Sequence, residues 1–175
     1  MNPASAAASL DAIEAALADL SDPEIPMVSL AELGILRSVR LGDDGMVEVV
    51  ITPTYSGCPA MGQIEDDIRA ALAAIDRPAR VVTQLTPAWT TDWMSEAARQ
   101  KLRAFGIAPP QGGSAGNTSH GTVKFSRRSA RIEAVQCPQC GSNNTTEVSP
   151  FGSTACKAQF RCLDCLEPFD YFKPY

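Results

Sequence analysis

Hydrophobic positions recur with two different periods along the first hundred residues. In residues 10–20 they are spaced three and four apart, which predicts an amphipathic helix capped by Ser9. In residues 47–51 they alternate, which predicts a strand with one buried face. In residues 64–75 the helical spacing returns. The pattern therefore predicts a helix, then a strand that leads directly into a second helix.

Turn-forming residues complete this first part. A turn at Gly42–Gly45 predicts a β-hairpin over residues 35–52, and residues 79–86 form a third strand. A connection of this length favours parallel pairing of the second and third strands through a right-handed crossover. Two prolines make residues 22–26 an ordered extended turn, and residues 95–103 are expected to form a third helix. We expect a small two-layer α/β domain with a three-stranded mixed sheet.

The second part of the chain differs in composition. Residues 108–121 are rich in Gly, Pro and Ser and predict a flexible linker. The expected division is an α/β domain over 1–107, this linker, and a small all-β domain over 122–175. His120, the only histidine, lies in the linker, where nearby cysteines are better metal ligands.

Four cysteines of the second part have the CxxC…CxxC form of a zinc ribbon, with 21 residues between the pairs: Cys137, Cys140, Cys162 and Cys165. Each pair can place two sulfurs on one tetrahedral ion, and Gly141 lets the first knuckle turn tightly. Iron is the alternative, disfavoured because Leu166 follows the second pair instead of a glycine. Cys156 is a fifth sulfur, either buried beside the ribbon or a thiol that exchanges with a cluster.

The sixth cysteine stands alone where the strand at 47–51 meets the following helix. Pro59 suits the first helical position, so we expect Cys58 to be the N-cap or its neighbour. A sulfur there meets unpaired amides and the positive helix end, which favour the thiolate. The alternative is a small buried cysteine that fills a corner. Trp89 and Trp93 are expected to cover the core or, alternatively, to roof this site.

Charge narrows the functional classes. The chain carries a net charge of −5, with −7 in residues 1–121 and +2 in residues 122–175. An acidic chain is a poor general nucleic-acid binder. No run approaches the ~20 apolar residues of a membrane span, and no secretory signal is visible. The crowded cysteines fit metal binding in a reducing compartment, so a cytoplasmic location is expected.

Several motifs resemble a known family: DPEIP at 22–26, ELG at 32–34, TPTYSGCP at 52–59 and WMSEAA at 93–98. They are similar to those of the MIP18 (DUF59) family of iron–sulfur assembly factors. With the ribbon, the run FGSTACK at 151–157 and the tail EPFDYF at 167–172, the chain resembles the PaaD (PaaJ) members. Those members are encoded with the ring-epoxidising phenylacetyl-CoA oxygenase.

The resemblance implies that Cys58 is the functional residue, as a reactive thiol or transient ligand of iron or an iron–sulfur cluster. It implies an accessory protein that matures the oxygenase, by supplying or repairing the cluster of the reductase component or, alternatively, the di-iron centre. Asp22 and Glu24 are candidates to line the same cleft, or simply form a turn. Zinc in the ribbon and a transient iron or iron–sulfur cluster at Cys58 are the expected metals.

Other functions stay open at this point. The chain could be a structural or regulatory subunit of the oxygenase without metal transfer. A thiol-dependent enzyme lacks support, since the α/β part contains no histidine as general base. A homodimer is an alternative to a monomer. Four basic residues precede the first knuckle and either dock an acidic recipient or form a solvated face: Lys124, Arg127, Arg128 and Arg131.

Overall fold

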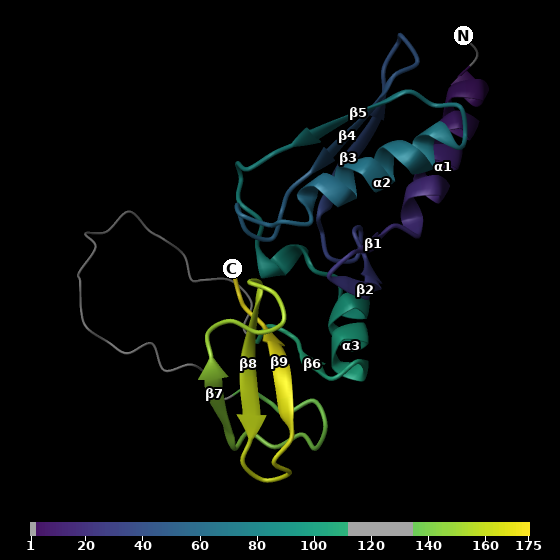
Figure 1. The fold of residues 1–175 in the computed structure, drawn as a ribbon. Coiled ribbons are helices and arrows are strands. Elements are labelled where there is room, and N and C mark those ends of the chain that lie inside the picture. Colours follow the sequence, from purple (N-terminus) through teal and green to yellow (C-terminus); the bar gives the residue numbers. More distant parts are fainter. Residues whose placement is uncertain (1–2, 112–134) are drawn as a thin grey trace, which may run out of the picture. The chain divides into compact units, whose positions relative to one another are not determined.

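The computed structural model describes residues 3–111 and 135–175, with side chains from residue 10 onward. The chain divides into two compact units (Figure 1). The first unit contains Met1–Trp89 and Trp93–Lys101, and the second contains Thr90–Asp92 and Leu102–Tyr175. The division therefore falls earlier in the sequence than residue 107, where the expected α/β domain ends.

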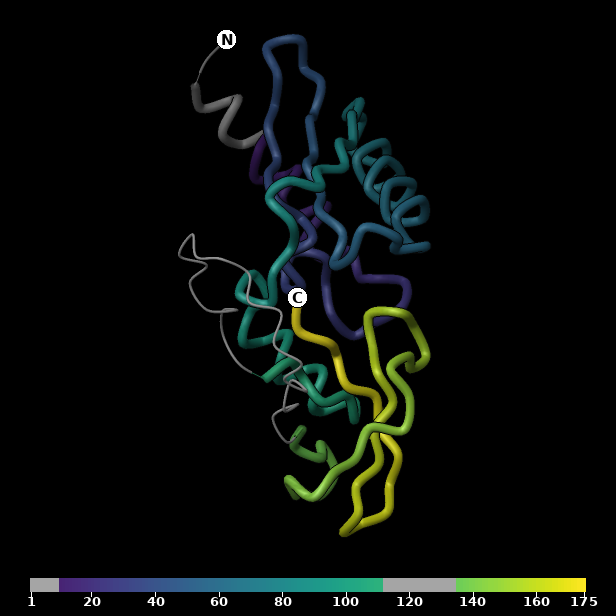
Figure 2. The backbone as a smooth tube through the Cα atoms, turned by 90° about the vertical axis from the view of Figure 1, so that its left-hand side faces the viewer, coloured from purple at the N-terminus to yellow at the C-terminus, as the bar shows by residue number. Residues whose placement is uncertain are grey.

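The sheet of the first unit has the predicted three strands. Strands β3 (Leu36–Leu41) and β4 (Val47–Ile51) form an antiparallel hairpin, and β5 (Ala79–Thr83) pairs with β4 in parallel. Helix α2 (Met61–Ala73) makes the crossover between β4 and β5. The prediction of a mixed sheet is confirmed. Figure 2 shows the tip of the β3–β4 hairpin extending beyond the paired strands.

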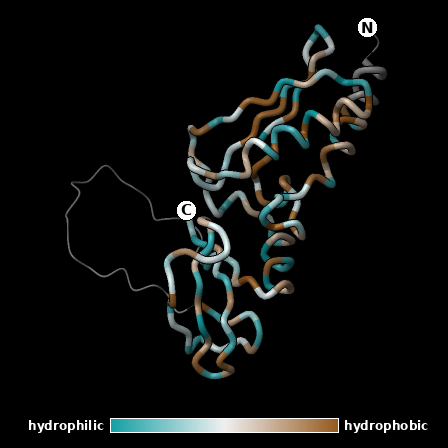
Figure 3. Tube along the Cα trace, viewed as in Figure 1, coloured by the Kyte–Doolittle hydropathy of each residue, from teal (hydrophilic) through white to brown (hydrophobic). Residues whose placement is uncertain are grey.

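The hydrophobic core of this unit is formed by the residues that alternate along β4 and by those at helical spacing along α2. Alternate residues of β4 are fully buried, as are the residues of α2 at helical spacing: Val47, Val49, Ile51, Ile64, Ile68 and Leu72. Figure 3 shows the strands as predominantly hydrophobic and the hairpin tip as hydrophilic. Helix α1 (Pro3–Ala18) packs against α2 and β3.

The start of α1 differs from the prediction. The helix begins at Pro3, so Ser9 lies inside it and is not its cap. The alanine-rich residues 4–8 have high helix propensity, which extends the helix beyond its amphipathic part.

The expected turn at residues 22–26 is a small hairpin of β1 (Ser21–Asp22) and β2 (Ile25–Ser29). After it, Gly34 has φ of +72°, and a Cβ there would lie 2.6 Å from the Trp93 carbonyl oxygen. The short 3₁₀ helix η1 (Thr91–Trp93) leads to α3 (Glu96–Ala104), and Gly106, with φ of +79°, follows two residues after its end. The predicted third helix is confirmed.

The second unit is built on a four-stranded sheet in the order β6-β9-β8-β7. Its strands are β6 (Ile107–Ala108), β7 (Thr145–Ser149), β8 (Lys157–Cys162) and β9 (Pro168–Phe172). Strands β7, β8 and β9 are antiparallel, whereas β6 is parallel to β9. The buried cluster consists of Ala108, Val135, Cys137, Ala158, Phe160, Cys162, Phe169 and Tyr171. Ile107, the last residue of the expected α/β domain, and Ala108, the first residue of the expected linker, thus belong to the ribbon sheet.

Candidate functional site

The two CxxC knuckles bring four sulfur atoms together in the second unit. The Sγ atoms of Cys137, Cys140, Cys162 and Cys165 lie within 4.8 Å of one another. The Cys137–Cys165 and Cys140–Cys162 Sγ–Sγ distances are 3.8 and 3.6 Å. Sulfurs at ~2.3 Å from a tetrahedral ion lie about 3.8 Å apart. The geometry therefore fits one tetrahedrally bound metal, as the spacing predicted.

The pKa values of two of these thiols, Cys162 and Cys165, are shifted in opposite directions. The backbone N–H of Cys165 donates to the Cys162 sulfur at 3.5 Å and, with the Asp164 amide, lowers the Cys162 pKa to about 7. The Glu167 amide acts in the same direction on Cys165. Desolvation and the neighbouring sulfurs outweigh it and raise the Cys165 pKa to about 12. A bound dication replaces the thiol protons, so that all four sulfurs can be thiolates at the same time.

Polar side chains tie the two knuckles to each other. The Asp164 carboxylate accepts hydrogen bonds from the Ser142 hydroxyl and from Asn144 Nδ2, the latter at 2.7 Å. These bonds lower the pKa of Asp164. Sequence reasoning missed this support, although a carboxylate inside CxxC and a serine just after the other pair were visible signals.

The absence of a glycine after Cys165 does not disfavour iron, although the sequence suggested that it does. Leu166 follows Cys165 with φ of +67°, and Gly141 follows Cys140 with φ of +76°. Leucine thus adopts the left-handed conformation that glycine adopts in the first knuckle, so both knuckles turn alike.

Cys156 lies outside the four-sulfur group. It precedes β8, whereas Cys162 ends that strand, so roughly 20 Å of extended chain separates them. Its sulfur is buried and lies 2.9 Å from the Thr154 hydroxyl. The next residue, Lys157, is also buried and forms an ion pair with Asp170 at 3.8 Å. The interpretation of Cys156 as a buried thiol beside the ribbon fits this position.

Cys58 occupies the turn between β4 and α2, as predicted. Its backbone N–H donates to the Tyr55 carbonyl at 3.2 Å, and its side chain is half-buried. Just before it, Thr54 and Thr52 are buried. Among the residues with described side chains, none makes a hydrogen bond to the Thr52 hydroxyl. The residues that lead into the turn are therefore buried, while the Cys58 sulfur stays partly accessible.

The prediction that Cys58 is the N-cap or its neighbour is wrong, because Cys58 lies two residues before the N-cap. Helix α2 begins at Met61 with Ala60 as N-cap, and the Ala60 carbonyl accepts the first helical bond from Ile64. The turn closed between Tyr55 and Cys58 delays the helix. Since the helix field falls off within one turn, the dipole favours a Cys58 thiolate less than the sequence pattern suggested.

Asp22 is buried, and its carboxylate accepts the Glu24 backbone N–H at 2.7 Å. This bond gives Asp22 the turn-forming role that was the alternative for it. Among the described residues, Asp22, Glu24 and Cys58 do not gather into a three-ligand group. Their shared cleft stays a prediction.

The tryptophans pack around residues 32–34. Trp89 is buried and donates its indole N–H to the Leu33 carbonyl at 2.9 Å, as a cover of the core requires. The Arg37 guanidinium lies 3.4 Å from the Trp93 ring centroid.

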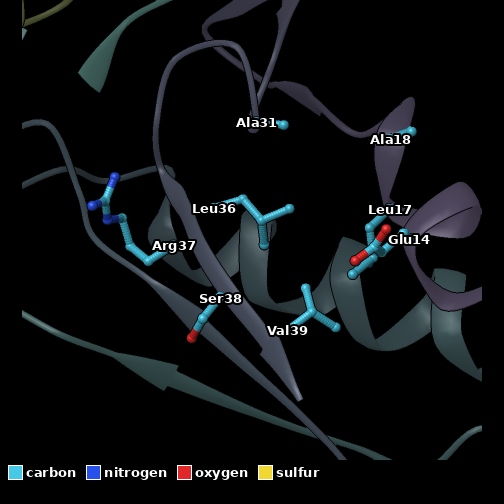
Figure 4. Close-up of a pocket in the computed structure, with 8 residues that line it drawn as sticks. All are labelled: Glu14, Leu17, Ala18, Ala31, Leu36, Arg37, Ser38 and Val39. Atoms are coloured by element: carbon cyan, nitrogen blue, oxygen red, sulfur yellow. The ribbon is translucent and has the colours of Figure 1, made fainter. Parts of the chain in front are cut away.

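A pocket of about 360 Å³ lies elsewhere in the first unit, between α1 and β3 (Figure 4). Leu17, Leu36 and Val39 are among its lining residues, and Arg37 points away from Leu36 and Val39. None of the predicted site residues lines it. His120 and the predicted basic cluster lie outside the described residues.

Comparisons with known proteins match both parts of the chain. Residues 10–83 match the iron–sulfur cluster assembly protein family, and residues 122–173 match the PaaD zinc beta ribbon domain. A protein of Escherichia coli K12, provisionally named as a component of 1,2-phenylacetyl-CoA epoxidase, is 47% identical over 92% of this chain and 90% of that protein. The chain belongs to the DUF59 family of iron–sulfur cluster assembly proteins. Within that family it carries the PaaD ribbon.

Other relatives match about half of the chain. The Fe-S protein maturation auxiliary factor of Porphyromonas gingivalis is 40% identical over 46% of this chain and 78% of that protein. The corresponding factor YitW of Bacillus subtilis is 34% identical over 51% and 89%. The crystal structure of a DUF59 domain from Bacillus anthracis has a TM-score of 0.52 and 28% identity, and covers 58% of this chain and 97% of that domain. No helix among the described residues has the length and apolarity needed to cross a membrane.

Proposed function

We propose that this DUF59 protein is an accessory maturation factor for a ring-epoxidising phenylacetyl-CoA oxygenase, and that it supplies or repairs the iron–sulfur cluster of the reductase component. The observation that carries the proposal is the similarity to the E. coli epoxidase component over both units. Relatives that match about half of the chain are named as Fe-S maturation factors. Residues 10–83 match the iron–sulfur cluster assembly protein family, which supports cluster handling by the first unit.

Cys58 is the proposed point of contact with the cluster. It is the only cysteine before residue 137, whereas iron–sulfur clusters are typically held by four cysteines. Cys58 therefore supplies one ligand, and the recipient supplies the others. Such a site binds its cargo weakly enough to release it.

Transfer at this site is an exchange of ligands. The bond from iron to the Cys58 sulfur breaks, and a bond from iron to a recipient thiolate forms. The proton that leaves the recipient thiol returns to the Cys58 thiolate, so that no atom changes oxidation state. The partly accessible sulfur in an ordered turn suits this exchange, because an incoming thiol can approach while the backbone stays fixed.

We infer that the ribbon binds one structural zinc ion through its four cysteines. The support is the sulfur geometry together with the match to a zinc ribbon domain. Zinc supplies no redox chemistry and fixes the two knuckles. None of the six cysteines forms a disulfide, which supports a reducing, cytoplasmic location for the protein.

The test is to produce the oxygenase and its reductase with the wild-type chain or with Cys58→Ala. We expect the variant to leave the reductase deficient in iron and acid-labile sulfide, with low epoxidation activity. The matched control is Ser56→Ala, an exposed residue of the same turn, which should support the reductase as the wild type does.

A second outcome identifies the alternative function. If Cys58→Ala yields a fully loaded reductase, and the chain co-purifies with the oxygenase at fixed stoichiometry, the protein is a structural or regulatory subunit. Cluster delivery through Cys58 is then wrong.

A further inference from the structure

The second knuckle of the ribbon presents two leucines to solvent. Leu163 is 48% exposed and Leu166 is 59% exposed, on either side of Asp164 and Cys165. Neither belongs to the buried cluster of the ribbon. Their side chains therefore add little to the packing of the sheet.

The backbone makes Leu166 an unexpected residue at its position. Its φ of +67° is a conformation that bulky L-residues rarely adopt. The first knuckle makes the same turn with Gly141, at φ of +76°. The Arg161 side chain donates to the Leu166 carbonyl, and the Cys162 N–H donates to the Glu167 carbonyl. These bonds hold the turn through the backbone, so the turn does not need the leucine side chain.

The charges around the two leucines are mostly negative. Asp164 lies between them and Glu167 follows them, with Arg161 as the only cation in residues 161–167. The knuckle is thus an apolar tip with an acidic border. Such a surface complements an apolar patch bordered by lysine or arginine.

We propose that Leu163 and Leu166 form a docking surface for the protein that receives the cluster, whose contact surface is apolar with a basic border. This inference rests on the proposed function, since the recipient is taken to be the reductase component. The zinc ion then has a mechanical role, because it fixes the knuckle that carries both leucines. The recipient is held at the ribbon while exchange takes place at Cys58.

The experiment measures binding of the full chain to the purified oxygenase and reductase components of the same organism by titration calorimetry. Leu166→Gly removes the side chain and supplies the residue that the turn favours, so the ribbon should keep its zinc and its melting temperature. Loss of one such side chain from an interface should raise Kd about tenfold. The double variant Leu163→Ser, Leu166→Gly should raise Kd about a hundredfold.

Two further variants separate this surface from general effects. Val148→Ser removes an apolar side chain of 58% exposure from β7 and should leave Kd unchanged. Glu167→Lys should weaken binding in low salt, and the difference should shrink as the ionic strength rises.

The possible failures are distinguishable. If the wild type binds and Leu166→Gly binds equally well, the docking surface is wrong and the proposed function stands. If the wild type binds neither component, the proposed partner is wrong and the docking surface is rejected with it. If the wild type sediments as a dimer that Leu166→Gly dissociates, the leucines contact a second copy and the assignment to a recipient is wrong.

Discussion

In the ribbon, four sulfurs lie within 4.8 Å of one another, whereas Cys58 is the one cysteine of the other unit. The ribbon sulfurs come from two pairs that are 21 residues apart, and hydrogen bonds between the knuckles support them. Cys58 depends on one local turn. A complete ligand set can retain a metal, and a single ligand can only share one. Under the proposed function, the cysteine side chain stabilises the fold in the ribbon and serves ligand exchange in the first unit.

The largest effect should come from breaking the complete set. Cys162→Ser removes a fully buried ligand, so we expect loss of the metal and unfolding of β7–β9, while the first unit stays folded. Structural zinc contributes about 10–16 kcal/mol in zinc-finger peptides, far more than packing of a small sheet. Elemental analysis and amide NMR of the full chain measure both effects. Cys156→Ser should retain the metal. If the variant ribbon stays folded without metal, its hydrophobic core is sufficient to hold the fold, and the prediction is wrong.

The first unit should be destabilised by a steric clash and not by loss of a metal. Gly34→Ala adds a methyl group 2.6 Å from the Trp93 carbonyl oxygen at a positive φ, so we expect about 3 kcal/mol of destabilisation. Gly45→Ala is the control, since Gly45 also has a positive φ but open space around its Cα. It should cost about 1 kcal/mol. Urea unfolding measures the free energy of unfolding of both variants. If the two variants are destabilised equally, the clash with Trp93 does not contribute.

Cys58→Ala should have a smaller effect on stability. The sulfur is half-buried and belongs to no ligand group among the described residues, so we expect a loss of about 1 kcal/mol. Thermal unfolding of the variant measures it. A largely unfolded first unit would make Cys58 a structural residue, and a failure of reductase loading would then need no ligand role.

The smallest effect concerns the ion pair of Glu32 with Lys101, at 2.7 Å. Burial raises the pKa of Glu32, but the bonds from Lys101 and Ser29 outweigh it and hold the pKa below the usual 4.5. A lowered carboxyl pKa stabilises the fold above the ordinary pKa, and this contribution disappears as the pH falls below 4.5. Glu32→Gln should therefore cost about 0.5 kcal/mol at about pH 7 and less at about pH 4. Unfolding at both pH values, with exposed Glu14→Gln as control, provides the check.

The four-sulfur group could be predicted from the sequence because CxxC spacing brings each pair of sulfurs together locally. The mixed sheet was predictable for a similar reason, since its strands and crossover helix differ in hydrophobic period. The start of α2 was not, because it depends on the Tyr55–Cys58 hydrogen bond, which no periodicity records.

Long-range contacts explain the remaining differences. Strand β6 has only two residues, and only its partner β9 makes it a strand. Leu166 departs from the glycine expected of a knuckle, yet the turn forms because surrounding bonds and sulfurs over-determine it. Gly34 of the ELG motif is required because the Trp93 backbone leaves no room for a Cβ, and this contact cannot be read from the sequence.

The pairing of β6 with β9 bears on how such a module can be cut and moved between proteins. A fragment that starts at residue 122, where the family match to the ribbon begins, lacks the edge strand and the buried Ala108. It would expose one side of β9 as an unpaired edge open to association with other chains. A graft or an isolated ribbon should therefore start at about residue 102, where the second compact unit resumes. The division between the two compact units thus lies inside α3, before the glycine-rich residues 108–121.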